Sequence, residues 1–187
     1  PFPGHPRLPS GLTRRMTTTP QQYVQEKAAG SGSSFYYAFL FLPPPRRAAI
    51  TAFYAFCREV DDVVDETSDV GVAATKLAWW RSEVAKAFAG QPSQHPVLQA
   101  LMPHAPLYNI TAAHLHAVID GCEMDLTIRR YETFDDLKTY CYRVASVVGL
   151  ICIEIFGYRN PNTRDYAVNL GMALQLTNIL RDVGEDM

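Results

Sequence analysis

Residues 58–66 read REVDDVVDE, and residues 178–186 read NILRDVGED. Each stretch carries two aspartates four residues apart, Asp61 and Asp65 in the first and Asp182 and Asp186 in the second. On a helix, this spacing places the two carboxylates of a pair one turn apart on the same face. Magnesium takes oxygen ligands and commonly bridges one or two carboxylates to substrate phosphates. If both pairs face one cavity, the pattern predicts an enzyme that acts on a diphosphate.

The first pair belongs to a polar stripe on a long helix. Tyr54, Arg58, Asp61, Asp62 and Asp65 recur at spacings of three and four, which places them along one side of that helix. A solvated helix end would also carry acidic residues. However, acidic groups are unfavourable at the negative C-terminal end of the helix dipole, and like charges one turn apart repel by about 0.2–0.5 kcal/mol. A bound cation would remove both costs, so the pattern favours a metal site.

The second pair lies on a matching stripe near the end of the chain. Gln175, Asn178, Asp182 and Asp186 share one face, and Arg181 lies beside them. An amide and a carboxylate four residues apart can both donate an oxygen to one metal ion. The planar guanidinium of Arg181 suits diphosphate oxygens. Such a stripe is weak evidence alone, but the two stripes together form a specific pattern.

Three further segments each leave alternatives open. The loop 31–34, SGSS, offers hydroxyl and N–H groups before a helix, and is either a phosphate site or an ordinary linker or helix cap. The acidic stretch 120–126, DGCEMDL, supplies a ligand, a partner for an arginine, or a satisfied structural group. Tyr140 and Tyr142 precede an apolar run, and either line a pocket or belong to the core. The five histidines lack partners at metal-ligand spacing and receive no role.

The composition predicts one globular domain with its own core. The chain has 187 residues, which suffices for such a core, and 17 basic against 19 acidic residues give no electrostatic footprint for nucleic acid. No apolar run is expected to reach the length of a membrane span, because the longest, 35–42, is stopped by three prolines. Four cysteines lack CxxC spacing, which favours buried free thiols and a reducing cytoplasm.

Helix signals cover nearly the whole chain after residue 18, and the sequence shows no sustained alternation typical of strands. Thr19 and Pro20 begin the first helix, and Gly30 ends it. We expect helices over residues 20–30, 35–42, 43–66, 72–89, 96–105, 111–129, 133–156 and from 163 to the end. Residues 1–16, which are rich in Pro and Gly, are predicted to be either an added or upstream-translated leader before a natural start at Met16, or a native disordered tail.

Three ordered motifs resemble the squalene/phytoene synthase family. Residues 54–65 (YAFCREVDDVVD) resemble its first signature, residues 175–186 (QLTNILRDVGED) its second, and residues 140–145 (YCYRVA) the segment between them. The resemblance runs from about Thr17 to the end of the chain. Two stretches, 31–37 (SGSSFYY) and 57–66 (CREVDDVVDE), are most similar to bacterial presqualene diphosphate synthases, with phytoene synthases as the next candidates.

This resemblance implies an all-α class I isoprenoid synthase bundle around a central cavity, which condenses two allylic diphosphates head-to-head. The implied product is presqualene diphosphate, made from two farnesyl diphosphates in squalene or hopanoid biosynthesis. The alternative is a phytoene synthase that acts on geranylgeranyl diphosphate. A non-catalytic relative that serves in assembly or partner binding is a third hypothesis, which the intact aspartates disfavour. No nucleotide-binding signature supports a reductive second step with NADPH.

The resemblance also assigns roles by position. The ligands expected to hold several Mg²⁺ ions, on two opposite walls, are Asp61, Asp65, Asn178, Asp182 and Asp186. The side chains expected to contact substrate are Ser31, Ser34, Tyr54, Arg58, Gln175, Asn178 and Arg181. The catalytic set comprises the four aspartates and a tyrosine at the reacting centre, Tyr142 or Tyr140.

The chain departs from the family pattern in two places. Gly32 stands where the family has the first serine of SxSF, so Ser31 or Ser33 would have to replace it. Family members continue with further helices after the second motif, whereas this chain ends at Met187. We therefore expect residues 17–187 to be a truncated synthase domain with exposed apolar walls, which self-associates and lacks activity. The full-length protein is expected in the cytoplasm, with peripheral membrane contact through its apolar product. The prenyl chain length depends on the cavity floor and is not readable from the sequence.

Overall fold

The fold is an all-α bundle, seen in a computed structural model that describes residues 18–32, 34–127, 132–169, 171, 172 and 176. Within these residues every regular element is helical, which confirms the predicted fold class. The elements are α1 (Pro20–Gly30), α2 (Ser34–Phe39), α3 (Pro44–Asp65), α4 (Val70–Phe88), α5 (Pro96–Leu101), α6 (Ala112–Thr127), α7 (Phe134–Cys141), the π-helix η1 (Tyr142–Ser146) and α8 (Val147–Phe156). Residues 163–169 are also helical.

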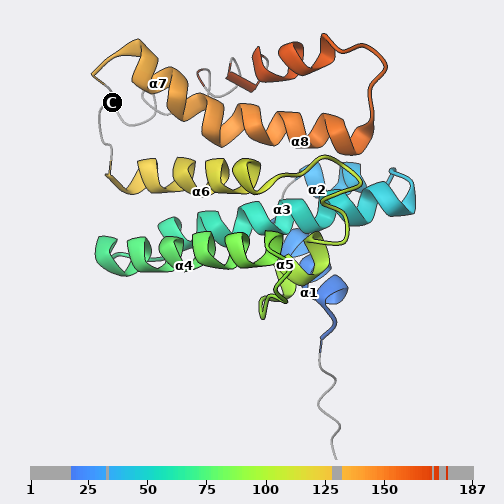
Figure 1. Ribbon diagram of the computed structural model, residues 1–187, viewed down its shortest axis with the longest axis horizontal. Helices are drawn as coiled ribbons and strands as arrows, with labels where there is room; N and C mark the ends of the chain where they lie inside the picture. Colours follow the sequence, from blue (N-terminus) through green and yellow to red (C-terminus); the bar gives the residue numbers. More distant parts are fainter. Residues whose placement is uncertain (1–17, 33, 128–131, 170, 173–175, 177–187) are drawn as a thin grey trace, which may run out of the picture.

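α3 is the central helix of the bundle, because it packs against α1, α2, α4, α5, α6 and α8. In Figure 1, α7 and α8 lie in an upper layer with the segment 163–169, α6 lies below them, and α3 and α4 lie below α6. α3 and α6 run in the same direction, whereas the α7–α8 helix runs oppositely (Figure 1). The C-terminal ends of α3 and α6 therefore meet the start of α7 at one end of the bundle.

The apolar residues of α3 fill the core. Ile50, Phe53, Phe56 and Val60 recur at spacings of three and four, and each is at most 1% exposed. Burying one such side chain stabilises the fold by about 1.5–3 kcal/mol. The side chains of the other helices that are buried to the same degree include Leu77, Leu98, Leu115, Ile119 and Ile151. Because α3 is surrounded along most of its length, its polar stripe is confined to the C-terminal part.

Several helix ends follow local signals that the sequence already shows. The Thr19 hydroxyl accepts a hydrogen bond from the Gln22 N–H at 3.1 Å, and the Gln22 side chain accepts one from the Thr19 N–H at 2.9 Å. This reciprocal pair is a capping box, which begins α1. Gly90 and Gly157, the predicted stops after α4 and α8, have φ values of 82° and 81°. Glycine adopts this left-handed region without the steric cost of a Cβ atom.

The predicted helix 133–156 is continuous, but it contains the π-helical segment Tyr142–Ser146. Two neighbours approach this segment closely. A Cβ atom on Gly121 of α6 would lie 2.7 Å from Val144 Cγ1, and one on Gly171 would lie 3.0 Å from the Ala145 carbonyl oxygen. The Ser146 hydroxyl also donates to the Val168 carbonyl at 2.8 Å. The π segment therefore packs between α6 on one side and Val168 and Gly171 on the other.

The helical stretch Phe134–Phe156 is long and apolar enough, by length and composition, to cross a membrane. This differs from the expectation that no apolar run reaches that length. Core helices pass the same test, and this one packs against α3 and α6 along one face. In the described structure it forms one wall of the bundle interior.

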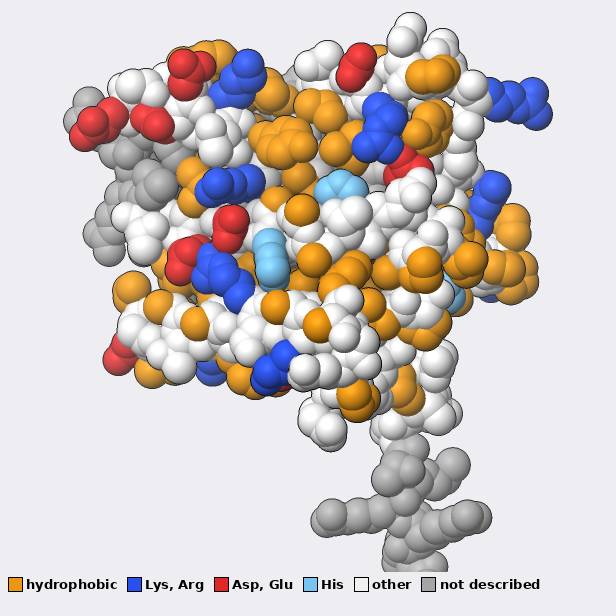
Figure 2. Space-filling model, in the orientation of Figure 1, with side chains coloured by type: hydrophobic (Ala, Val, Ile, Leu, Met, Phe, Trp, Pro, Cys, Tyr) orange, Lys and Arg blue, Asp and Glu red, His pale blue; other side chains and the backbone are white. Residues whose placement is uncertain are grey.

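Large apolar side chains are also exposed on the surface. Tyr37, Leu40 and Phe41 lie at and just after the end of α2, and Phe41 is 91% exposed. Figure 2 shows orange apolar side chains at the right-hand edge of the molecule, where α2 and the start of α3 lie. Phe134 and Tyr166 are exposed as well. Exposed apolar surface of this kind favours association, and the self-association of this chain stays a prediction.

Candidate functional site

A cavity of about 570 Å³ lies between α3, α6 and the α7–α8 helix. Its charged and polar lining includes Tyr54, Arg58 and Asp61 of α3, Asp125 of α6 and Tyr140 of α7. Most of the remaining lining is apolar, and it includes Phe39, Ile50, Phe53, Val118, Val144, Val148 and Phe156. A cavity that is polar at one end and apolar along its length suits a ligand with a charged head and a hydrocarbon tail.

Two carboxylates face this cavity from different helices, Asp61 on α3 and Asp125 on α6. Burial raises the pKa of Asp61, and the charge of Asp65 raises it further, against the opposing effect of Arg58. Burial also raises the pKa of Asp125, which a hydrogen bond with the Tyr140 hydroxyl opposes and the charge of Asp65 reinforces. Negative charge is therefore concentrated and poorly solvated at this end of the cavity, and a bound cation would stabilise it.

These carboxylates fit a magnesium site that is completed by substrate. Mg²⁺ is usually bound through one or two carboxylates together with substrate phosphates and waters. Asp61 and Asp125 supply such carboxylates, and Asp65 is exposed at the end of α3. Among the residues that the structure describes, no group of three or more His, Cys, Asp or Glu is arranged to hold a metal ion. The described wall can therefore contribute to a Mg²⁺–diphosphate site rather than form one unaided.

The second predicted wall lies outside the described residues. This applies to every side chain assigned to it, namely Gln175, Asn178, Arg181, Asp182 and Asp186. The helical segment 163–169, which precedes it, packs on the π-helical part of the cavity wall through the Ser146–Val168 hydrogen bond. The roles of the second wall stay predictions.

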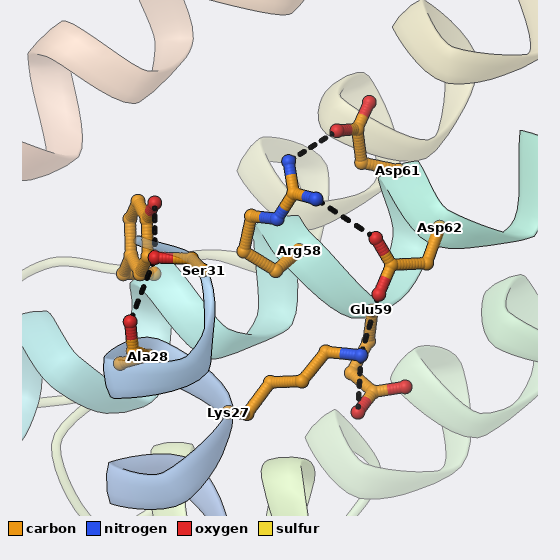
Figure 3. Close-up of polar contacts among 8 residues, drawn as sticks. Lys27, Ala28, Ser31, Arg58, Glu59, Asp61 and Asp62 are labelled. Atoms are coloured by element: carbon orange, nitrogen blue, oxygen red, sulfur yellow. Dashed lines mark hydrogen bonds and ion pairs between the residues drawn. The ribbon is translucent and has the colours of Figure 1, made fainter. Parts of the chain in front are cut away.

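Arg58 lies between two carboxylates of its own helix. Its Nη1 donates to Asp61 Oδ2 at 2.9 Å, and its Nη2 donates to Asp62 Oδ1 at 3.0 Å. Figure 3 shows this fork, with Asp62 extending from Arg58 towards Lys27 of α1. The Lys27 amine donates to Asp62 Oδ2 at 2.5 Å and lies 3.4 Å from Glu59 Oε1. The predicted stripe therefore divides: Asp61 faces the cavity, whereas Asp62 faces α1.

The predicted phosphate loop is placed differently from the other site residues. Ser31 caps the C-terminus of α1, where its hydroxyl donates to the Ala28 carbonyl at 2.7 Å and accepts from the Tyr54 hydroxyl at 3.1 Å. Tyr54 itself lines the cavity. Ser34 is the first residue of α2, and its side chain lies outside the described set, as does Ser33. Phosphate binding by Ser31 and Ser34 stays a prediction.

The structure brings Tyr140 to the cavity rather than Tyr142. Tyr140 is part of the lining and bonds to Asp125, whereas Tyr142 is 41% exposed. The two residues are two positions apart at the entry to the π-helical segment, so they point to different sides of the helix. Of the two tyrosines predicted for the reacting centre, Tyr142 and Tyr140, this placement favours Tyr140.

The acidic stretch 120–126 serves two purposes. Asp120 and Glu123 pair with Arg81 of α4, at 2.8 Å and 2.6 Å, on the side of α6 that packs against α4. Asp125 faces the cavity instead; the sequence offered the whole stretch as a possible source of a ligand but did not single out Asp125. Asp125 lies three residues from Cys122, another lining residue, and the sequence shows this spacing. Nothing in the sequence indicates which side of α6 packs against α3. Lys27 was missed for a simpler reason, because a single lysine in a helix carries no functional pattern.

Three of the four cysteines line the cavity, and all four are free thiols. Burial raises the pKa of Cys122 to about 12 and that of Cys152 to about 11. Burial also raises the pKa of Cys57 well above its ordinary value. Neutral thiols add to the apolar character of the wall.

Sequence comparison identifies relatives over most of this chain. A profile of the family described as squalene/phytoene synthase matches residues 28–187. The chain is 38% identical over 151 residues to a phytoene synthase of Arthrospira platensis, and 39% identical over 150 residues to a 15-cis-phytoene synthase of Synechococcus elongatus. Each alignment covers 74% of this chain and 48% of the relative. The chain thus spans about half the length of the curated relatives it matches.

Solved structures agree with this assignment. A dehydrosqualene synthase in complex with ligand superposes with a TM-score of 0.73 at 33% identity, over 89% of this chain and 60% of that chain. A squalene synthase of Alicyclobacillus acidocaldarius superposes with a TM-score of 0.75 at 29% identity, over 88% of this chain and 62% of that chain. The predicted isoprenoid synthase fold is therefore confirmed. On the profile match, the sequence identity and the shared fold, this chain belongs to the squalene/phytoene synthase family.

Proposed function

We propose that the protein containing this chain condenses two prenyl diphosphates head-to-head, with Mg²⁺ as cofactor. The observation that carries the proposal is the cavity, which has two poorly solvated carboxylates and an arginine at one end and apolar walls elsewhere. The polar end suits a diphosphate with its cations, and the apolar walls suit prenyl chains. Family membership supports the reaction class. Because the chain spans about half of its relatives, the activity is assigned to the full-length protein.

The reaction class begins with cleavage of the C1–O bond of one substrate, which releases its diphosphate and leaves an allylic cation. The double bond of the second substrate attacks that cation, and loss of a proton closes a cyclopropane ring. Arg58 offers a fixed positive charge to the departing diphosphate. Phe53, Val118, Val148 and the other apolar lining residues keep water from the cation.

Mg²⁺ would be held on the described wall by Asp61 and Asp125, with Asp65 beside them. On the second wall it would be held by the ligands predicted from the sequence. Mg²⁺, when bound, neutralises the charge that develops on the leaving diphosphate. The raised pKa values of Asp61 and Asp125 support this assignment, because both carboxylates gain most from a nearby positive charge.

Two substrate lengths are each supported by a separate observation. The motifs at residues 31–37 and 57–66 resemble those of presqualene diphosphate synthases, which favours farnesyl diphosphate. The curated relatives above are named phytoene synthases, which favours geranylgeranyl diphosphate. We propose farnesyl diphosphate as the first candidate substrate and geranylgeranyl diphosphate as the second.

The test is a product analysis of the full-length protein with Mg²⁺ and each diphosphate in turn. With farnesyl diphosphate we expect one inorganic pyrophosphate per presqualene diphosphate formed. With geranylgeranyl diphosphate we expect the corresponding C40 cyclopropyl diphosphate, or phytoene once that compound also loses its diphosphate and a proton as the ring opens, so two pyrophosphates per phytoene; the products are identified by mass spectrometry. Asp61→Asn should abolish the product while leaving the melting temperature close to that of the wild type. No condensation product from either substrate, with metal present, would refute the proposal. Tight substrate binding without turnover would instead support a non-catalytic relative.

We also propose that the protein works in a reducing cytoplasm, in peripheral contact with membranes that receive its apolar product. The four free thiols support the reducing compartment. Cell fractionation tests both the cytoplasmic location and the membrane contact. Release of the protein from the membrane fraction by salt or carbonate indicates peripheral contact.

A further inference from the structure

We infer that Lys27 is a positioning residue, which keeps the guanidinium of Arg58 directed into the cavity by sharing the carboxylate of Asp62. The inference rests on the proposed function in one respect, because it takes a diphosphate as the ligand of Arg58. Lys27 lies in the last turn of α1 and does not line the cavity, so it acts through Arg58 rather than on substrate.

The contacts form one continuous chain from α1 to the cavity. Lys27 donates to Asp62 Oδ2 at 2.5 Å, and Arg58 Nη2 donates to the other oxygen of the same carboxylate, Oδ1, at 3.0 Å. The second arm of the fork, Nη1, reaches Asp61 Oδ2 in the cavity at 2.9 Å. Figure 3 shows Arg58 with one arm towards each aspartate. Because the guanidinium is planar, holding Nη2 on Asp62 also determines where Nη1 points.

The charges explain why the lysine is needed. Glu59, Asp61 and Asp62 are three carboxylates within four residues, and Arg58 is the cation of α3 that contacts two of them. Lys27 supplies the second cation and contacts both Glu59 and Asp62. The side chains of Glu59 and Asp62 are only 15% and 19% exposed, so solvent screens their charges poorly. Without Lys27, Asp62 would compete more strongly for Arg58 and draw it away from the cavity.

Lys27 is not the only link between α1 and α3. The Tyr23 hydroxyl donates to Glu59 Oε1 at 2.6 Å, and the Tyr54 hydroxyl donates to Ser31 Oγ at 3.1 Å. Val24 of α1 is also buried in the core. These contacts hold the two helices together independently, which makes the effect of Lys27 on Arg58 separable from its effect on helix docking.

The experiment measures the binding of inorganic pyrophosphate with Mg²⁺ to the full-length protein by calorimetry, which does not depend on turnover. We expect Lys27→Met to raise the Kd for pyrophosphate about tenfold, as is typical of coupling within one ion-pair network. Lys27→Arg keeps the positive charge and should restore binding. The double variant Lys27→Met/Asp62→Asn removes the competing negative charge but keeps an amide oxygen that can still accept from Arg58 Nη2, so its Kd should return to within about threefold of the wild type.

A matched control is available in the same part of the surface. Lys76 lines the hollow that also contains Lys27, Glu59 and Asp62, but its amine contacts Thr67 Oγ1 at 3.4 Å. Lys76→Met should leave the Kd for pyrophosphate unchanged. If Lys27→Met folds poorly, Lys27→Met/Asp62→Asn is compared with Asp62→Asn alone. The Kd values for pyrophosphate of these two variants should then differ by no more than about twofold.

The outcomes separate this inference from the proposed function. An unchanged Kd in Lys27→Met would overturn the inference, and so would a double variant that binds as weakly as Lys27→Met, since both results indicate only a link between helices. A wild type that does not bind Mg²⁺ and pyrophosphate would overturn it too. A wild type that binds pyrophosphate but condenses no prenyl diphosphate would refute the proposed function alone.

Discussion

The cysteines of the cavity allow a quantitative test of whether its walls are apolar and closed to water. Burial is the main cause that raises the pKa of Cys122 from 9.0 to about 12. The thiolate is the form that reacts with alkylating agents, and at pH 8 it makes up about 9% of an ordinary thiol but only about 0.01% of one with the higher pKa. The more basic thiolate is also the better nucleophile, which offsets part of this difference, so we expect iodoacetamide to modify Cys122 roughly thirty to sixty times more slowly in the folded protein than in the unfolded chain.

The rate of Cys122 modification should increase with pH. Since the pKa of Cys122 is raised, its thiolate fraction increases about tenfold per pH unit well beyond pH 9, where an ordinary thiol is already levelling off. The rates are measured by peptide mapping with mass spectrometry, with the urea-unfolded chain as the reference state. Cys141 is the internal control, because it is buried but is not part of the described lining.

A bound ligand sharpens the same experiment. A non-hydrolysable prenyl diphosphate with Mg²⁺ should slow the modification of Cys57, Cys122 and Cys152 further, and leave Cys141 unaffected. If Cys122 of the folded protein reacts within about tenfold of the unfolded chain, its surroundings are hydrated and the reasoning about the cavity is wrong.

Three further predictions concern the metal wall, the helix packing and the surface. Asp125→Asn should raise the Mg²⁺ concentration for half-maximal activity of the full-length protein about tenfold. Asp120→Asn is the control and should not change this concentration, because the partner of Asp120 is Arg81. Equal effects of the two substitutions would contradict the assignment of Asp125 to the metal site. Gly121→Ala places a Cβ atom 2.7 Å from Val144 Cγ1, so urea unfolding should show a loss of about 1–3 kcal/mol that Val144→Ala relieves. The 187-residue chain alone should self-associate in light scattering, and Phe41→Ser should weaken this; a monodisperse monomer would refute it.

Much of the fold was predictable because the relevant signals are local. Thr19 with Gln22, and the prolines in the first turn of α3 and α5, begin helices through local effects within one turn. The predicted helix 35–42 ends at Phe39 instead. Residues 40–42 form i to i−3 hydrogen bonds, and the following Pro43 disfavours helical geometry at the residue before it. Such differences affect the ends of elements rather than their existence.

The site was predictable only in part. The spacing of Arg58, Asp61 and Asp65 indicates one helical face, and two of these residues line the cavity. The same spacing does not separate Asp61 from Asp62, because both lie near the edge of that face. Only the tertiary structure distinguishes the two aspartates, because Lys27 of α1 forms an ion pair with Asp62.

The sequence alone therefore determined that α3 is a long helix ending in an acidic stripe, and that the chain carries the motifs of its family. Periodicity, caps and prolines act within a few residues, so they can be read without a partner. The tertiary structure alone decided that Asp125 faces Asp61, that Lys27 shares Asp62 with Arg58, and that Tyr140 reaches the cavity. These three outcomes depend on how helices distant in sequence cross one another, and on the change of phase at the π-helical segment, which local patterns do not encode.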